Sequence, residues 1–90
     1  MTRNVSITLQ NTDDARPIIN AIQSDNPAAV VNVYPSMVKI DCPGKLVVRQ
    51  QTVEENLGRP WDVQELHLSL ISLAGEVDEE DDYFALEWRG

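Results

Sequence analysis

Residues 37–66 constrain the fold most, because this stretch places two turns and a helix stop between short patterned segments. Residues 37–42 carry apolar side chains at alternate positions, which is typical of a strand with one buried face. Pro43-Gly44 then predicts a tight turn, and residues 45–50 follow as another patterned strand. Short connections of this kind favour antiparallel strands.

A run rich in β-branched residues, 29–34, precedes this stretch and leads into Tyr34-Pro35-Ser36. Two such runs on either side of a proline-containing turn predict an antiparallel hairpin. Residues 45–50 are then expected to return as the third strand of the same meander.

A short helix is predicted after the meander. Thr52 is the expected N-cap, and Glu55, three residues later, completes a capping box in which each side chain accepts a hydrogen bond from the other residue's N–H. Gly58 suits the left-handed position that ends a helix, and Pro60 prevents continuation.

Asp62 and Glu65 repeat the capping-box spacing. Trp61 before this box and Leu66 after it are placed to form a hydrophobic staple. From Leu66 to Leu73 the apolar residues alternate, and this predicts a strand.

The end of the chain is punctuated by Gly75, which is expected to end that strand. Asp78–Asp82 is expected to form a solvated acidic loop, and residues 83–88 a final strand. The inward positions of this strand are expected to be Phe84, Leu86 and Trp88.

The first part of the chain predicts a strand and a helix. Apolar and polar residues alternate over positions 5–10. Asp14 is the expected N-cap of the helix, with Pro17 in the first turn and Pro27 beyond the end. Its predicted apolar face consists of Ala15, Ile18, Ile19, Ala21 and Ile22. Together the elements predict one α+β domain, residues 1–90, with antiparallel strands in two small sheets packed around one or two helices.

The formal net charge of −8 argues against binding to nucleic acid or to anionic lipid. A single cysteine, Cys42, cannot form an internal disulfide, and its alternation with apolar neighbours predicts a buried thiol. No stretch approaches the ~20 apolar residues of a membrane span, so we expect a cytoplasmic protein without a membrane partner.

The residues that an active site would need are missing from the sequence. His67 is the only histidine, so a zinc site would have to recruit several carboxylates. No serine lies in a nucleophile elbow, and no glycine-rich phosphate loop is present. Asp78–Asp82 lacks the spacing of an EF-hand. We therefore expect a non-enzymatic binding or regulatory module that carries no metal, flavin or haem.

Several motifs of the central stretch carry a family resemblance. They are Asp41-x-Pro43-Gly44-x-Leu46, Thr52-x-Glu54-Glu55-x-Leu57-Gly58-Arg59-Pro60, Gln64-Glu65-Leu66, and a strand that ends at Gly75 before an acidic loop. With these motifs the chain closely resembles the effector, or coupling, proteins of bacterial multicomponent di-iron monooxygenases. The phenol hydroxylase branch is the nearest, and the toluene and methane monooxygenase effectors are more distant.

The resemblance implies a cofactor-free protein that docks on a separate di-iron hydroxylase. Docking would control oxygen activation, substrate access and the coupling of electron transfer to hydroxylation. In physical terms, the effector would bind one conformation of the hydroxylase better than another. The free protein is expected to be a monomer.

Two other classes of function stay open at this stage. One is an acidic protein-binding module that mimics nucleic acid and blocks a basic site. The concentration of acids in turns, at Asp13-Asp14 and Asp78–Asp82, counts against the continuous charged face that such a mimic needs. The other is a small-molecule sensor, which would need a polar-lined cavity.

A docking surface is predicted around the first helix and the first hairpin. Tyr34 and Met37 are apolar residues for which strand alternation gives no clear place in the core, and such residues beside polar groups are typical of an interface centre. The alternative is that both cover the end of a sheet. The acidic loop is expected to steer the encounter with the partner. The predicted contact residues are Asn11, Arg16, Asn20, Gln23, Tyr34, Ser36 and Met37.

Overall fold

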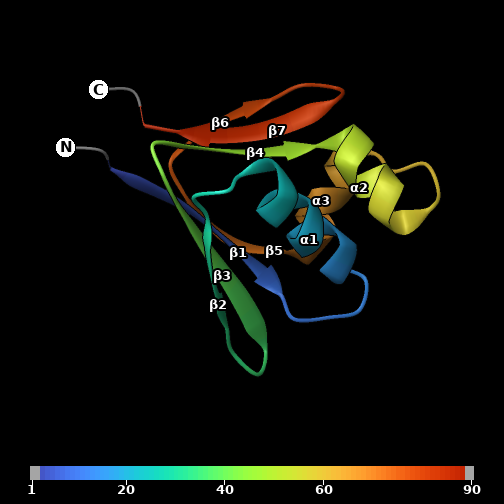
Figure 1. Ribbon diagram of the computed structural model, residues 1–90, viewed down its shortest axis with the longest axis horizontal. Helices are drawn as coiled ribbons and strands as arrows, with labels where there is room; N and C mark the ends of the chain where they lie inside the picture. The colour runs from blue at the N-terminus through green and yellow to red at the C-terminus, as the bar shows by residue number, and fades with distance from the viewer. Residues whose placement is uncertain (1–2, 89–90) are drawn as a thin grey trace.

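The computed structural model describes residues 3–88 of the chain (Figure 1). Within this part the elements in chain order are β1 (Asn4–Gln10), α1 (Arg16–Asp25), β2 (Val30–Val33), β3 (Met37–Pro43), β4 (Lys45–Arg49), α2 (Gln50–Leu57), the 3-10 turn η1 (Val63–Glu65), α3 (Leu66–Ser69), β5 (Leu70–Ala74), β6 (Glu76–Glu79) and β7 (Tyr83–Glu87).

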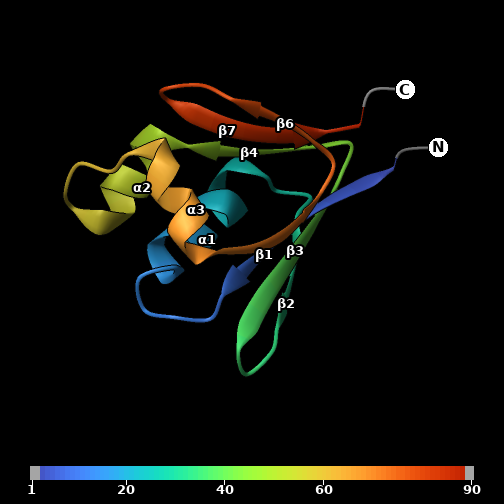
Figure 2. The same cartoon turned by 180° about the vertical axis from the view of Figure 1, so that it is seen from behind.

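The strands form two antiparallel sheets, one in the order β2-β3-β1-β5 and the other in the order β4-β7-β6. Figures 1 and 2 show the sheets converging near the chain ends and diverging toward the helices, which fill the open side of the wedge. At the narrow end the Trp88 indole N–H donates to the Asn4 carbonyl over 2.8 Å. The prediction of an α+β fold with two small antiparallel sheets is confirmed.

The core lies between the sheets and takes side chains from both of them. Val5, Ile7 and Leu9 of β1 are fully buried, as their alternation predicts. The apolar face predicted for the first helix is also buried, and in β7 Phe84 and Leu86 point into the core. The hydrophobic pattern of the sequence therefore predicted correctly which face of these elements is buried.

The prediction of Asp14 as the N-cap of the first helix is wrong, because the N-cap lies one residue later, at Ala15. The helix starts at Arg16, and Ala15 occupies the N-cap position without a side-chain hydrogen bond. The Thr12 hydroxyl accepts a hydrogen bond from the Ala15 N–H over 3.2 Å, and Asp14 is exposed. A turn closed by Thr12 thus leads into the helix. Pro17 lies in the first turn of the helix, as expected.

The prediction of a third meander strand is wrong, because β4 pairs with β7. Both edges of β3 are already occupied, one by β2 and the other by β1, so no edge is left for β4. Gly44, at φ +77°, redirects the chain into the second sheet, and its N–H donates to the Arg3 carbonyl over 2.9 Å.

The predicted Thr52 cap is also wrong. α2 begins at Gln50, so Thr52 lies inside the helix, and Arg49 takes the N-cap position without a side-chain hydrogen bond. The Gln50 N–H donates instead to the Asp82 carbonyl over 2.9 Å, so a long-range contact starts the helix. Its end follows the prediction, because Gly58 has φ +73° and its N–H bonds back to the Glu54 carbonyl.

The Asp62–Glu65 capping box is present in full. Because this box starts a 3-10 turn that continues as α3, the strand predicted from Leu66 to Leu73 is wrong over its first part. Strand β5 begins only at Leu70. The solvated acidic loop is also shorter than predicted, because Asp78 and Glu79 pair with β7 as part of β6.

Candidate functional site

The β2–β3 hairpin extends beyond the helices at one corner of the molecule (Figure 1). Its tip consists of the four residues Tyr34, Pro35, Ser36 and Met37, and the Tyr34 N–H donates to the Met37 carbonyl over 2.8 Å. Tyr34 is 44% exposed, whereas Met37 is half-buried. An aromatic side chain that keeps this much of its surface exposed is available to a partner.

Asn11 joins this tip to the segment between β1 and α1. Its backbone N–H donates to the Ser36 carbonyl over 3.2 Å, and its side-chain Nδ2 donates to the Tyr34 carbonyl over 2.9 Å. The β1 strand thus reaches past its last paired residue and contacts the turn itself.

A groove of about 390 Å³ separates the polar side of α1 from the hairpin. Arg16, Asn20 and Gln23 stand exposed along its helical side, and none of them has a side-chain partner within residues 3–88. Asn11 and four apolar side chains form the rest of the lining. The full lining is Asn11, Arg16, Ile19, Asn20, Gln23, Val31, Val33 and Val38.

The predicted residues lie on two faces that meet at the hairpin. Val33 pairs with Val38, whose side chain is buried in the core, so both point toward α1. Tyr34 and Met37 are the next residues along and therefore point to the opposite, outer face of the sheet. Asn11, Arg16, Asn20 and Gln23 are brought together around the groove, while Tyr34, Ser36 and Met37 gather at the tip.

Sequence reasoning missed Val33, which is 68% exposed, and Val30, which is 58% exposed. Val33 shares a face with Val31 and Val38, so the alternation of β2 could have placed it beside the first helix. The pattern could not show that a groove separates α1 from the hairpin and leaves Val33 exposed.

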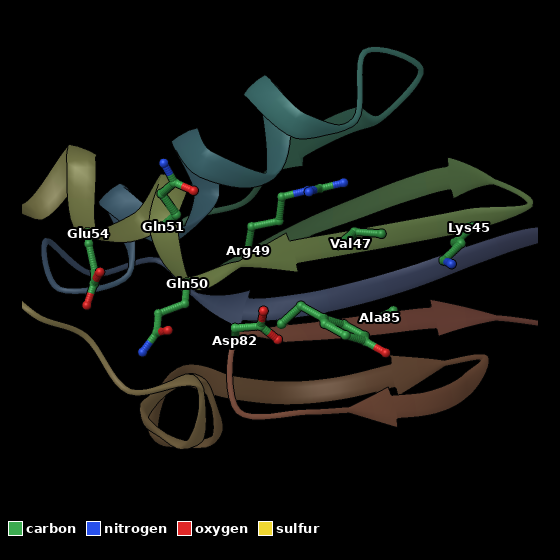
Figure 3. A pocket seen from close by; sticks show the side chains of 9 residues that line it. Lys45, Val47, Arg49, Gln50, Gln51, Glu54, Asp82 and Ala85 are labelled. Carbon is green, nitrogen blue, oxygen red and sulfur yellow. The ribbon is translucent and has the colours of Figure 1, made fainter.

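A second hollow, of about 500 Å³, lies over the outer face of the β4–β7 pair (Figure 3). Lys45 and Arg49 rise from β4, and neither has an ion pair or side-chain hydrogen bond within the described residues. Gln50 and Glu54 are already engaged, because both bond the backbone of Trp61, at 2.7 and 2.8 Å. These two lining residues therefore hold the α2–η1 connection in place.

The same hollow is also lined by a hydrogen-bonded tyrosine, Tyr83, which pairs with Arg49. The Tyr83 hydroxyl donates to the Asp78 carboxylate over 3.0 Å. This hydrogen bond, with smaller contributions from burial and from the nearby carboxylates, raises the pKa of Tyr83 above its usual value. The phenol therefore stays protonated to a higher pH than a free tyrosine.

The remaining reactive side chains are held in structural contacts. His67 bonds the Glu79 carboxylate over 2.7 Å and packs edge-on against Phe84. Cys42 is buried, and this burial raises the pKa of its thiol. Among residues 3–88 no cluster of histidine, cysteine and carboxylate side chains is arranged to hold a metal ion. In the same part of the chain no helix is long and apolar enough to cross a bilayer.

Comparison with known proteins assigns this arrangement to a family. The model of the MmoB/DmpM family matches residues 3–87, which is nearly the whole chain. The chain belongs to the MmoB/DmpM family. The resemblance read from the central motifs is thereby confirmed.

Three similar proteins match over all or nearly all of their length. The chain is 49% identical over 89 residues to the stimulatory component DmpM of phenol 2-monooxygenase from Pseudomonas sp. (strain CF600), and the match covers 99% of both chains. In two solved structures of a phenol hydroxylase–regulatory protein complex, the matching chains are 46% and 44% identical. Their TM-scores are 0.92 and 0.88, and the matches cover 97% and 96% of this chain and 100% of those chains.

The fold extends to a more distant structure. The soluble methane monooxygenase regulatory protein B is 22% identical, with a TM-score of 0.74 over 96% of this chain and 65% of that one. At this identity the likeness concerns the fold alone.

Proposed function

We propose that this chain is the regulatory component of a phenol-type aromatic monooxygenase and acts by binding a di-iron hydroxylase. The 49% identity to the DmpM stimulatory component over 99% of both chains carries the proposal. Near-identical folds in two complexes of a phenol hydroxylase with its regulatory protein support it. The protein would work in the cytoplasm, beside the hydroxylase.

The proposed mechanism requires no chemistry from this chain. Oxygen activation and hydroxylation belong to the hydroxylase, and the regulatory protein contributes only binding free energy. If it binds the active conformation of the hydroxylase more tightly than the resting one, saturation with the protein shifts the hydroxylase toward activity. Substrate access and the coupling of electrons to product would follow from the same shift.

The docking surface is proposed to combine the hairpin tip with the groove beside α1. Tyr34 supplies an exposed aromatic side chain, and Val33 adds an apolar one on the other face of the hairpin. Arg16, Asn20 and Gln23 offer unpaired donors along the helix, where a partner's carbonyl or carboxylate groups could bind. An apolar centre bordered by polar groups is the usual composition of a protein interface.

The acidic residues beyond β6 would act at longer range. Glu80, Asp81 and Asp82 are exposed in the β6–β7 loop and can attract a basic partner surface without being buried. Replacing all three by their amides should slow association at low salt and have little effect at high salt, because exposed charges are screened.

The test is a titration of a phenol hydroxylase, supplied with electrons, with the purified chain. The rate of phenol hydroxylation and the product formed per electron pair should both rise and reach a plateau. A protein that leaves both quantities unchanged at large excess would rule out the regulatory role. Denatured chain at the same concentration serves as the control.

A further inference from the structure

The tip of the β2–β3 hairpin is fastened to the rest of the molecule by one side chain. Within residues 3–88, Asn11 makes the only side-chain hydrogen bond to residues 34–37. The Asn11 backbone also bonds the Ser36 carbonyl, so one residue holds two of the carbonyl groups of the turn.

Apart from the pairing of Met37 with Gln10 of β1, little else restrains this tip. β2 is a four-residue strand at the edge of its sheet, and it is paired only with β3. Val33, Tyr34, Pro35 and Ser36 are all exposed, so core packing does not hold them. A short hairpin tip that extends beyond the core gains stability from hydrogen bonds to a third segment.

Asn11 also belongs to the lining of the groove beside α1. Its side chain is only partly exposed, and its Nδ2 is directed to the Tyr34 carbonyl. The residue therefore stands where the two faces of the proposed docking surface meet and fixes the hairpin relative to α1.

We propose that Asn11 is a positioning residue, which acts on the hydroxylase through the hairpin tip and not through a contact of its own. The inference rests on the proposed function, because it assumes that the tip docks. Holding Tyr34 in its docking position before binding removes part of the ordering cost of association. The half-saturating concentration should respond to Asn11, whereas the rate at saturation should not.

The experiment is a double-mutant cycle between Asn11→Ala and Tyr34→Ala, read as half-saturating concentration and plateau rate in the hydroxylase titration. Asn11→Ala alone should raise the half-saturating concentration roughly 2- to 10-fold, the range for one hydrogen bond. In the Tyr34→Ala background Asn11→Ala should have almost no further effect, because the aromatic side chain that Asn11 positions is absent. Additive effects would show that Asn11 contacts the partner itself and would overturn the proposal.

One more variant separates the hydrogen bond from the side-chain volume, and another serves as the control. Asn11→Asp keeps the shape of the side chain but has no N–H for the Tyr34 carbonyl. Its half-saturating concentration should therefore rise at least as much as that of Asn11→Ala. A wild-type half-saturating concentration for Asn11→Asp would contradict the inference. Asn56→Ala is the matched control, since the Asn56 amide donates to the Pro17 carbonyl over 3.1 Å at another exposed site.

Backbone amide exchange of the free protein tests the tether independently of the hydroxylase. The Tyr34 N–H, bonded to the Met37 carbonyl, should exchange faster in Asn11→Ala and remain unchanged in Asn56→Ala. If wild-type chain does not stimulate the hydroxylase, the proposed function fails. If it does and Tyr34→Ala or Asn11→Ala titrates like wild type, or exchange is unchanged, the positioning role fails.

Discussion

Replacing Asn26 should destabilise the protein more than any other exchange of a single amide on its helices. Asn26 ends α1, is only 8% exposed and directs its side chain at β4, the edge strand of the second sheet. Its Nδ2 donates to the Val47 carbonyl and the Ile22 carbonyl, both over 2.8 Å, and its Oδ1 accepts from the Val47 N–H over 3.0 Å. One amide thus completes the sheet edge as a neighbouring strand would.

The magnitude follows from these three bonds. Asn26→Ala removes all of them, and at roughly 0.5–1.5 kcal/mol each the loss of unfolding free energy is about 1.5–4.5 kcal/mol. The Ile22 carbonyl keeps the Asn26 backbone N–H as a partner, so the unpaired groups are those of Val47. For a domain with a total stability of about 5–15 kcal/mol this is a large fraction.

Asn26→Asp is the more selective change, because it keeps the shape of the side chain. The carboxylate can still accept from Val47, but it has no N–H to donate and faces two carbonyl oxygens in a buried site. At neutral pH we expect Asn26→Asp to lower the free energy of unfolding at least as much as Asn26→Ala does.

Urea unfolding followed by tryptophan fluorescence measures both losses, since Trp61 is buried in the folded protein. The transition midpoint should fall with an unchanged slope on denaturant concentration. Asn56→Ala, which removes a single exposed bond, should cost less than about 1 kcal/mol. A loss below about 1 kcal/mol for both Asn26 variants would refute the assignment of this amide as the link between α1 and β4.

Three further predictions concern local structure. Gly75→Ala should destabilise the protein more than Gly58→Ala in the same urea assay. A Cβ at Gly75 (φ +138°) would lie 3.0 Å from Val5 Cγ1, whereas one at Gly58 would meet nothing within 4 Å. Gly58→Ala should cost about 1 kcal/mol for its left-handed backbone alone. Thr52→Ala should change stability by less than about 0.5 kcal/mol, since Thr52 caps nothing, and a loss near 1 kcal/mol would restore it as a cap. Asp78→Asn should lower the pKa of Tyr83 toward its usual value, because the hydrogen bond to Asp78 is the main cause of the raised pKa; ultraviolet titration in a Tyr34→Phe background would follow this, and an unmoved pKa would count against that cause.

Features set by neighbouring residues could be predicted from the sequence. Val5, Ile7 and Leu9 alternate because only one face of β1 is buried, and the Asp62–Glu65 box closes within four residues. The left-handed Gly58 and the Tyr34-Pro35-Ser36 turn are local in the same sense.

Features set by distant residues could not. β4 joins β7 because β1 and β2 already occupy β3, and no pattern in residues 45–50 reports that competition. α2 starts at Gln50 because of the Asp82 carbonyl, and a local rule therefore favoured Thr52 wrongly. Leu66 and Leu68 fit a strand pattern and a short helix alike, so the capping box before them decided the structure.

The candidate site divides in the same way. Exposure of Tyr34 followed from its lack of a place in the strand pattern, and the polar side of α1 followed from helical spacing. The groove lies between α1 and the hairpin, and it depends on how the helix packs beside β2 and β3. This packing is a tertiary property, and so the exposure of Val33 could not be predicted.

The central claim is that the hairpin tip and the groove bind the hydroxylase. Its most direct test is the dissociation constant of the complex between purified hydroxylase and wild-type, Tyr34→Ala or Val77→Ala chain. Val77 is the control, because it is an exposed apolar residue on β6, at the other end of the molecule from the hairpin (Figure 1). Tyr34→Ala should weaken binding by on the order of 1–2 kcal/mol, about 5- to 30-fold, and Val77→Ala should leave it unchanged. Equal affinity of wild type and Tyr34→Ala, with both variants folded, would contradict the account.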